Sequence, residues 1–306
     1  MPHQPASSAL QRFRVIDLTQ VRAGPTACRQ LADWGADVIQ VQMPESMRGD
    51  DTLGGQEGSD YQYTHRNKRS ITLNLKTDEG IATLKRLIDG ADVVVENFRP
   101  DVKFRLGIDY ASLSATNPGL VYASISGFGQ TGPLAARPGF DQIAQGMGGL
   151  MSVTGQQGDG PMRVGIPIAD LCAGIFAAQG ILVALLEREA SGKGQFLHTS
   201  LLESMIYMLD FQTSRYLIDG EVACGLISNM KEALEEPQVQ HLGMVKEVVS
   251  KWQGPQRLVG QPMQLERTPS TIARAAPRRG EHTEEILSEL GLGADDLVRM
   301  KAAGVY

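Results

Sequence analysis

The stretch RVIDLTQVRAGPTACRQLADWGADVIQV, residues 14–41, joins two apolar strand patterns through one helix pattern. Strands are predicted over 14–18 and 37–41, and a helix over 25–34 with a proline in its first turn. Two consecutive strands joined by a helix pair in parallel within one sheet. This stretch therefore predicts an α/β fold.

The same alternation continues through the first two hundred residues. Further strands are predicted over 70–75, 91–95, 120–126 and 196–201, and further helices over 78–88, 141–151, 171–186 and from 201 to about 217. The polar, glycine-containing range 42–69 is predicted to be a surface loop. Together the elements predict a Rossmann-like parallel sheet flanked by helices on both faces.

The alternation ends after residue 217. The remaining chain contains a helix start at 229–234, a β-like stretch at 256–264, a Pro/Arg-rich loop at 268–280 and a closing helix at 282–290. We expect this segment to return to the first domain rather than to form a domain of its own.

Composition limits the classes of function. The chain has 306 residues, 42% of them hydrophobic, and a net charge of −6. The negative charge argues against a nucleic-acid partner, and the five scattered histidines argue against a metal site. We expect no membrane partner, because the apolar run 174–186 is too short to span a bilayer and is predicted to be a buried helix.

Cysteine usage bears on the compartment. Cys28, Cys172 and Cys224 lack metal-ligand spacing and suit a reducing environment, so a cytoplasmic location is expected. The range 1–16 has two arginines and no acid, a composition shared with mitochondrial transit peptides. A ragged N-terminal tail is the plainer expectation.

One acid stands in an apolar setting. Asp170 follows the run VGIPIA at 164–169 and precedes a helix pattern without further charge until Glu187. A carboxylate in an apolar environment must be hydrogen-bonded, be neutralised or take part in a reaction. Two interpretations stay open: an N-cap of the helix at 171–186, and a nucleophile, which the helix N-terminus would keep in its reactive ionised form.

Polar and aromatic residues follow several predicted strands. Arg22 lies in a strand-to-helix turn, where backbone N–H groups can bind an anion, although an ordinary turn is the alternative. Asn97 and Phe98 stand at the carboxyl end of a strand, where open α/β sheets bind ligands, and Arg105 follows seven residues after Phe98. For this group the alternative is a turn stabilised by asparagine.

Two more motifs have plain alternatives. The cluster HRNKRS at 65–70 predicts either a solvated loop or a phosphate contact through Lys68 and Arg69. Asp141 opens a predicted helix, and on its own it is interpreted as an N-cap.

Taken in order, these pieces resemble the class III CoA-transferase family, which also contains the α-methylacyl-CoA racemases. The matching segments are VIDL at 15–18, AGP at 23–25, GADVI at 35–39, NKRS at 67–70, VENF at 95–98, SGFGQTGP at 126–133, RPGFD at 137–141, Asp170, GKGQ at 192–195, EPQV at 236–239 and GEHT at 280–283. Each motif alone is weak, but the ordered set is specific and covers nearly the whole chain.

The resemblance implies a CoA thioester donor, a free carboxylic or dicarboxylic acid acceptor, coenzyme A as co-substrate and no metal. It implies that Asp170 attacks the thioester carbonyl, forming first a mixed anhydride and then an aspartyl-CoA thioester, and that the acceptor reverses these steps. Phe140 and Asp141 match positions beside the reacting carbonyl. The positions that match CoA contacts of the family are Arg22, Lys68, Arg69, Leu73, Asn97, Phe98 and Arg105.

Phe140 separates the two branches of the family. Racemisation removes and returns a proton beside the thioester carbonyl, so it needs an acid/base pair. Racemases of the family carry histidine at this position, and phenylalanine cannot move a proton. The resemblance therefore favours CoA transfer over racemisation.

The chain departs from the family near residues 219–226, where a small second domain is absent. We expect a large CoA-binding domain over 1–217, a truncated remnant over 218–228 and a C-terminal segment over 229–306. The absent domain includes a glycine-rich loop that closes over the nucleophile, and family members form interlocked homodimers. A homodimer is expected; a non-catalytic variant or an inactive partner subunit is the alternative.

Overall fold

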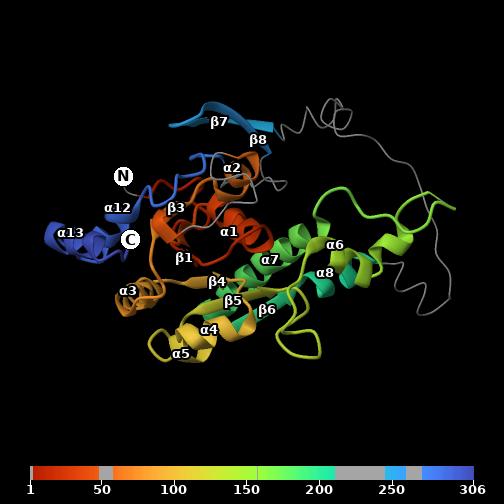
Figure 1. Ribbon diagram of the computed structural model, residues 1–306, viewed down its shortest axis with the longest axis horizontal. Helices are drawn as coiled ribbons and strands as arrows, with labels where there is room; N and C mark the ends of the chain where they lie inside the picture. The colour runs from red at the N-terminus through yellow and green to blue at the C-terminus, as the bar shows by residue number, and fades with distance from the viewer. Residues whose placement is uncertain (1–2, 48–57, 157, 211–244, 260–270) are drawn as a thin grey trace.

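A six-stranded parallel sheet lies at the centre of the computed structural model, which describes residues 3–47, 58–156, 158–210, 245–259 and 271–306 (Figure 1). The sheet has the order β3-β2-β1-β4-β5-β6, and every neighbouring pair is parallel. Its strands are β1 (Arg14–Asp17), β2 (Asp37–Gln42), β3 (Arg69–Thr72), β4 (Val93–Glu96), β5 (Val121–Ser126) and β6 (Phe196–Ser200).

This arrangement confirms the predicted Rossmann-like sheet. Its order reverses between β1 and β4, which are hydrogen-bonded neighbours although two strands separate them in sequence. Open α/β sheets bind ligands outside the carboxyl ends of their strands at such a reversal. The loops that follow β1 and β4 are therefore where a ligand is expected.

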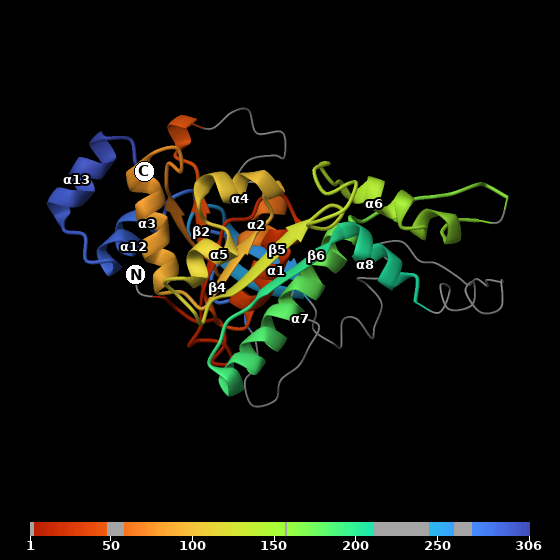
Figure 2. The same cartoon turned by 90° about the horizontal axis from the view of Figure 1, so that it is seen from below.

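Helices cover both faces of the sheet (Figures 1 and 2). The face that carries Val15 and Val38 packs against α1 (Ala23–Asp33), α6 (Asp141–Met147), α7 (Ile168–Ser191) and α8 (Leu201–Met208). The face that carries Ile16 and Ile39 packs against α3 (Asp78–Asp89), α4 (Pro100–Leu106), α5 (Tyr110–Ser114), α12 (Thr283–Glu289) and α13 (Ala294–Ala302). Successive strand residues thus enter opposite cores, which explains why these strands are apolar at nearly every position.

Helix α7 packs closely against α1. A Cβ atom on Gly174 would lie 2.6 Å from the carbonyl oxygen of Ala23, so only glycine permits this approach. Among the described helices, α7 is long and apolar enough to cross a membrane by length and composition, a property that the core helix of a globular protein shares. It packs against α1 on one side and against β5 and β6 of the sheet, which accounts for its apolar character.

Several predicted elements differ from the structure. The predicted loop 42–69 contains α2 (Ser59–His65) and a 3-10 turn at Glu45–Met47. The hairpin of β7 (Val245–Ser250) and β8 (Gly254–Val259) has a first strand that the pattern did not reveal, and α13 was also not predicted. The helix start at 229–234, Cys224 and the remnant at 218–228 lie outside the described residues.

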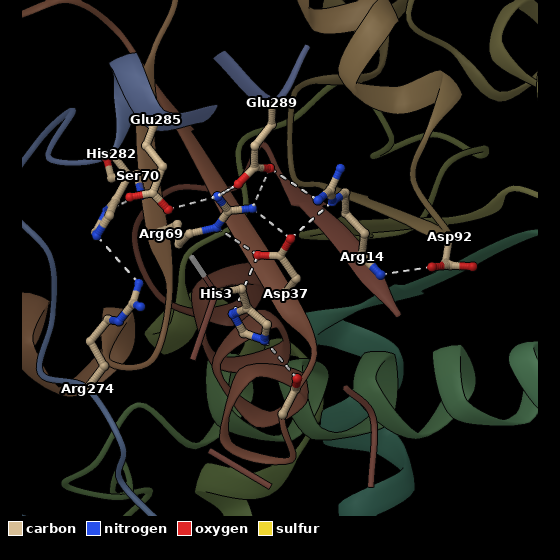
Figure 3. A network of polar contacts seen from close by, with 11 residues as sticks. His3, Arg14, Asp37, Arg69, Ser70, Asp92, Arg274, His282, Glu285 and Glu289 are labelled. Atoms are coloured by element: carbon tan, nitrogen blue, oxygen red, sulfur yellow. Dashed lines mark hydrogen bonds and ion pairs between the residues drawn. The ribbon is translucent and has the colours of Figure 1, made fainter. Parts of the chain in front are cut away.

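Residues 271–306 lie against the sheet and contribute to the core on the face that carries Ile16 and Ile39 (Figure 1). A network of ion pairs joins this segment to three strands (Figure 3). Arg69 of β3 donates to Asp37 of β2 at 2.7 Å and to Glu289 of α12 at 3.1 Å. Arg14 of β1 donates to the same two carboxylates at 3.0 and 3.2 Å. Arg14 and Arg69 thus hold α12 against the sheet.

The N-terminal residues join the same network, so the expected ragged tail is wrong from residue 3 onward. The ring of His3 lies 3.1 Å from the carbonyl oxygen of Gly35 and 3.6 Å from Asp37 (Figure 3). Ala6 and Ser7 are buried, and the carbonyl oxygen of Ala6 accepts a hydrogen bond from the hydroxyl of Thr271.

The GEHT motif at 280–283 protects the edge strand β3. His282 Nδ1 accepts a hydrogen bond from the Ser70 N–H at 3.3 Å, and Thr283 Oγ1 accepts one from the Thr72 N–H at 3.0 Å. Burial and the neighbouring Arg274 lower the pKa of His282 to about 4, which leaves its ring neutral and able to accept. The N–H groups of Ser70 and Thr72, which could otherwise pair with a strand of another chain, are therefore already hydrogen-bonded.

Thr283→Val is expected to lower the free energy of unfolding by about 1–3 kcal/mol, because the buried N–H of Thr72 then loses its acceptor while the side-chain volume is kept. Urea unfolding followed by circular dichroism measures the change. Ser288→Ala removes a hydroxyl from the exposed side of the same helix and is the control. Equal effects of the two substitutions would contradict this role.

Candidate active site

Asp170 lies at the N-terminus of α7, at the position where the sequence places the candidate nucleophile. The helix begins at Ile168 with Pro167 as its N-cap, so the N-cap interpretation of Asp170 is wrong. Asp170 is instead the third helical residue, and its side chain is half-buried. The capping role therefore falls to another residue.

Asp141 caps this helix from a different part of the chain. Its Oδ1 accepts hydrogen bonds from the N–H groups of Ala169 at 2.7 Å and Asp170 at 3.3 Å. The interpretation of Asp141 as the N-cap of its own helix is wrong, because Phe140 occupies that position in α6. Two helix starts that are distant in sequence are thus joined through one carboxylate.

Gln145 holds the Asp141 carboxylate in place. Its Nε2 donates to Asp141 Oδ2 at 2.7 Å, and its Oε1 accepts from the N–H of Val164 at 2.8 Å. Gln145 has no exposed surface. The segment that leads into α7 and the residue that caps α7 are therefore fixed by the same buried amide.

The Asp170 carboxyl group is less acidic than an ordinary aspartate. Burial, and then the nearby charge of Asp141, raise its pKa to about 6, while Arg22 opposes the rise. Burial thus outweighs the stabilisation of the carboxylate that the helix N-terminus is expected to provide, and the pKa rises rather than falls. Above about pH 6 the group is still mostly the carboxylate that a nucleophile must be.

Asp170→Asn is expected to stabilise the folded chain at neutral pH. Because the folded-state pKa of Asp170 lies above its unfolded value of 3.8, ionisation costs folding free energy as pH rises toward and past about 6. We expect the variant to be about 2 kcal/mol more stable at pH 8 and equal to the parent below about pH 4. Urea unfolding of both proteins at several pH values measures this difference in stability, and Asp159→Asn, at an exposed position, is the control. A variant less stable at pH 8 would contradict the raised pKa.

The loop after β1 lies beside Asp170. Val21 adopts φ +67°, a left-handed conformation that is strained for a β-branched residue, and it is followed directly by Arg22. Arg22 forms an ion pair with Asp60 of α2. This turn places the charge of Arg22 near Asp170. Nothing in the sequence marks Val21 as strained.

The loops after β1 and β4 are joined where the strand order reverses. Asn97 Oδ1 accepts from the N–H of Gln20 at 3.0 Å, and Asn97 Nδ2 donates to the carbonyl oxygen of Gln20 at 2.8 Å. Both hydrogen-bonding sides of the Asn97 amide are thus engaged with the backbone. The interpretation of Asn97 as a turn-stabilising residue fits this geometry.

A cavity of about 230 Å³ opens at the same edge of the sheet. Three predicted CoA contacts, Leu73, Phe98 and Arg105, are among its lining residues, and they come from the ends of β3 and β4 and from α4. Sequence reasoning missed Lys76, which also lines the cavity. Lys76 directly follows the predicted strand 70–75, and that position is the signal that could have found it.

Lys68 and Arg69 lie elsewhere, and the predicted solvated loop around them is wrong. Lys68 has no exposed surface and donates to Asp17 at 2.8 Å and to the Pro25 carbonyl oxygen at 3.1 Å. Arg69 is 1% exposed and is engaged by Asp37 and Glu289. Neither side chain has surface with which to contact a phosphate, so neither fits the CoA contact that the resemblance implies for it.

Phe140 stands beside Asp141 at the start of α6, with 62% of its surface exposed. Its ring is therefore available to a ligand or to another chain. Within the described part of the chain, no three His, Cys, Asp or Glu residues gather as a metal site would require.

Comparison with known proteins identifies the family. The model of CoA-transferase family III matches residues 10–223 and 215–283 of this chain. The chain belongs to CoA-transferase family III. The resemblance seen in the ordered motifs is thereby confirmed.

Relatives and solved structures agree with this assignment. A succinate–glutarate CoA-transferase of Agrobacterium fabrum is 45% identical over 69% of this chain and 55% of its own length. An acyl-CoA transferase of Fusarium pseudograminearum is 30% identical over 99% of this chain and 90% of its own length. The crystal structure of a CAIB/BAIF family protein from Brucella suis has a TM-score of 0.83 at 28% identity, covering 93% of this chain and 100% of that chain.

This chain is shorter than many of its relatives. It spans about half the length of the first curated relatives that it matches, 55% in Agrobacterium fabrum and 50% in Mus musculus. The alignment with the Fusarium protein extends over 411 positions, more than the 306 residues of this chain, so that relative has internal residues that this chain lacks.

Proposed function

We propose that this CoA-transferase family member moves CoA from an acyl-CoA thioester to a free carboxylic or dicarboxylic acid. The observation that carries the proposal is the arrangement at the strand-order reversal. There the cavity lined by Leu73, Phe98 and Arg105 is joined, through the β1 loop of Gln20–Arg22, to the half-buried Asp170. Relatives named as transferring CoA to glutarate or oxalate support dicarboxylic acceptors.

In the proposed reaction, Asp170 attacks the thioester carbonyl as a carboxylate. An oxygen–carbon bond forms, the carbon–sulfur bond breaks, and CoA leaves as thiolate, which gives an aspartyl anhydride. The thiolate then attacks the aspartyl carbonyl and releases the acyl carboxylate. The acceptor carboxylate repeats these steps in reverse, so that Asp170 is regenerated. Burial of Asp170 favours transfer because water would hydrolyse the anhydride.

Acyl exchange tests the proposal. Purified protein is mixed with a panel of acyl-CoA donors, including succinyl-CoA, and with oxalate, succinate or glutarate, and the new thioester is measured by chromatography. We expect exchange with at least one pair. Absence of exchange across a broad panel, in a protein that binds CoA, would count against the proposed transfer.

Racemisation is the disfavoured alternative within the family. Phe140 stands at the position where the resemblance places a histidine in racemases, and it offers no proton. We expect no deuterium to enter the α-carbon of a 2-methylacyl-CoA incubated with the protein in heavy water. Deuterium at the α-carbon, detected by mass spectrometry, would instead support racemisation.

We also propose that the active form includes a second chain, in the first instance a second copy. Large apolar side chains are exposed along α6, α7 and α8, namely Phe140, Ile143, Met147, Ile175, Val183, Leu186, Ile206 and Tyr207. Such a surface is typical of an interface. The short span relative to the curated relatives supports a second candidate, a non-catalytic subunit of a longer partner.

Sedimentation with and without a full-length relative separates these candidates. A homodimer with turnover would eliminate the non-catalytic subunit, whereas association with the longer relative and no turnover by itself would support it.

A further inference from the structure

Helix α4 buries a lysine and exposes the phenylalanine that follows it. Lys103 is 4% exposed, whereas Phe104 is 63% exposed. Burying an ammonium group is unfavourable unless it is paired, and an exposed phenylalanine forgoes favourable burial. The orientation of this short helix is therefore explained by what the Lys103 ammonium contacts.

The Lys103 ammonium joins the ends of two strands to a loop. It lies 3.0 Å from Glu96 Oε1 at the end of β4 and 3.2 Å from Ser124 Oγ in β5. It donates to Gln130 Oε1 at 2.6 Å and lies 5.5 Å from the centre of the Phe196 ring. All three hydrogen-bonding directions of the ammonium are used.

Glu96 connects this ammonium to the cavity. Its second oxygen, Oε2, accepts a hydrogen bond from the N–H of Phe98 at 2.8 Å. Phe98 lines the cavity proposed for CoA. The Lys103–Glu96 pair is thus fixed to the wall of the cavity.

Gln130 connects the ammonium to the nucleophile. It belongs to the loop 127–139, whose ends meet: a Cβ on Gly127 would lie 2.3 Å from Gly139 Cα. Such a closed loop moves largely as a unit. The residues that follow its closed end are Phe140 and Asp141, and Asp141 caps α7 at Asp170.

We propose that Lys103 is a positioning residue that holds the loop 127–139 against the end of β4, and so sets Asp141 against Asp170. The inference rests on the proposed function for its kinetic consequence, but the positioning itself does not require turnover. Lys103 touches no reacting atom and acts through Gln130.

Gln130→Ala is the principal test, because it removes the loop contact and leaves the Lys103–Glu96 pair intact. Gln156→Ala, in an exposed loop, is the matched control. A second variant, Glu96→Gln with Lys103→Met, removes both charges together and leaves an amide oxygen that can still accept from Phe98. This second variant tests Lys103 itself without leaving an unpaired buried charge.

Two measurements need no activity. Side-chain carbon NMR follows the titration of Asp170. We expect the pKa of Asp170 to fall in Gln130→Ala, because Asp141 is then held less closely against Asp170 and Asp170 is less buried, and both effects raise its pKa in the parent protein. Hydrogen exchange follows the amides of Gly129, Ala135 and Arg137, which are bonded within or beside the loop; we expect faster exchange.

The kinetic measurement compares kcat and KM for CoA transfer between the parent protein and the same variants. We expect kcat to fall roughly 10- to 100-fold in Gln130→Ala, while KM for acyl-CoA changes less than about threefold, because misplacement affects the reaction more than binding. An unchanged Asp170 titration together with unchanged loop exchange would overturn the inference. A parent protein without transfer, but with the expected titration and exchange, would instead contradict only the proposed function.

Discussion

Asp170→Asn is expected to lower the rate of CoA transfer by at least about 10³-fold and to leave the Kd for CoA within about twofold of the parent value. The amide cannot form the proposed anhydride, yet it keeps nearly the same volume beside Asp141. The cavity lining does not include Asp170, so binding should not depend on its charge. Steady-state kinetics and calorimetric titration of CoA measure the two quantities.

Asp159→Asn, in an exposed loop, is the control for this substitution and should retain the parent rate. The parent enzyme should also lose activity as pH falls through about 6, in proportion to the fraction of protonated Asp170. Retention of a tenth of the rate by Asp170→Asn would show that the carboxylate is not the nucleophile.

Lys68→Met is expected to lower the free energy of unfolding by about 3–5 kcal/mol, the largest stability effect predicted for this chain. Neither Lys68 nor Asp17 has exposed side-chain surface, so deletion of the cation leaves an uncompensated buried carboxylate. Asp17 also accepts hydrogen bonds from the N–H of Thr19 at 2.9 Å and from its hydroxyl at 2.6 Å. Its disturbance should therefore reach the loop that carries Arg22. Urea unfolding measures the loss.

The double variant Asp17→Asn with Lys68→Met provides the control, because it removes both charges and keeps an acceptor for Thr19. We expect it to recover most of the lost stability. A double variant as unstable as Lys68→Met alone would show that the packing of the lysine chain, rather than its charge, matters at this site.

Much of the fold follows from local sequence patterns. The predicted strands around Ile16, Ile39 and Val94 lie within or next to the observed β1, β2 and β4, because buried parallel strands are recognisable as short apolar runs. The helix α2 was missed because its sequence, SDYQYTH, is polar and short. Its stability comes from contacts with α1 rather than from a periodic pattern of its own.

The candidate site was only partly predictable. The resemblance singles out Asp170, Leu73, Phe98 and Arg105. The structure places the last three in the lining of one cavity and Asp170 in the first turn of α7. The capping role of Asp141 could not be predicted from the sequence, because the helix that it caps begins 27 residues after it. Lys68 was placed at the surface because charge alone indicates exposure, and only the fold shows that Asp17 is opposite it.

Chemical trapping of the covalent intermediate tests the central claim most directly. The protein is incubated with a reactive acyl-CoA in the presence of hydroxylamine, digested, and its peptides are mapped by mass spectrometry. A hydroxamate on Asp170, absent from Asp170→Asn and dependent on the acyl-CoA, is the predicted result. Transfer activity with a label on another residue, or with none, would contradict the account.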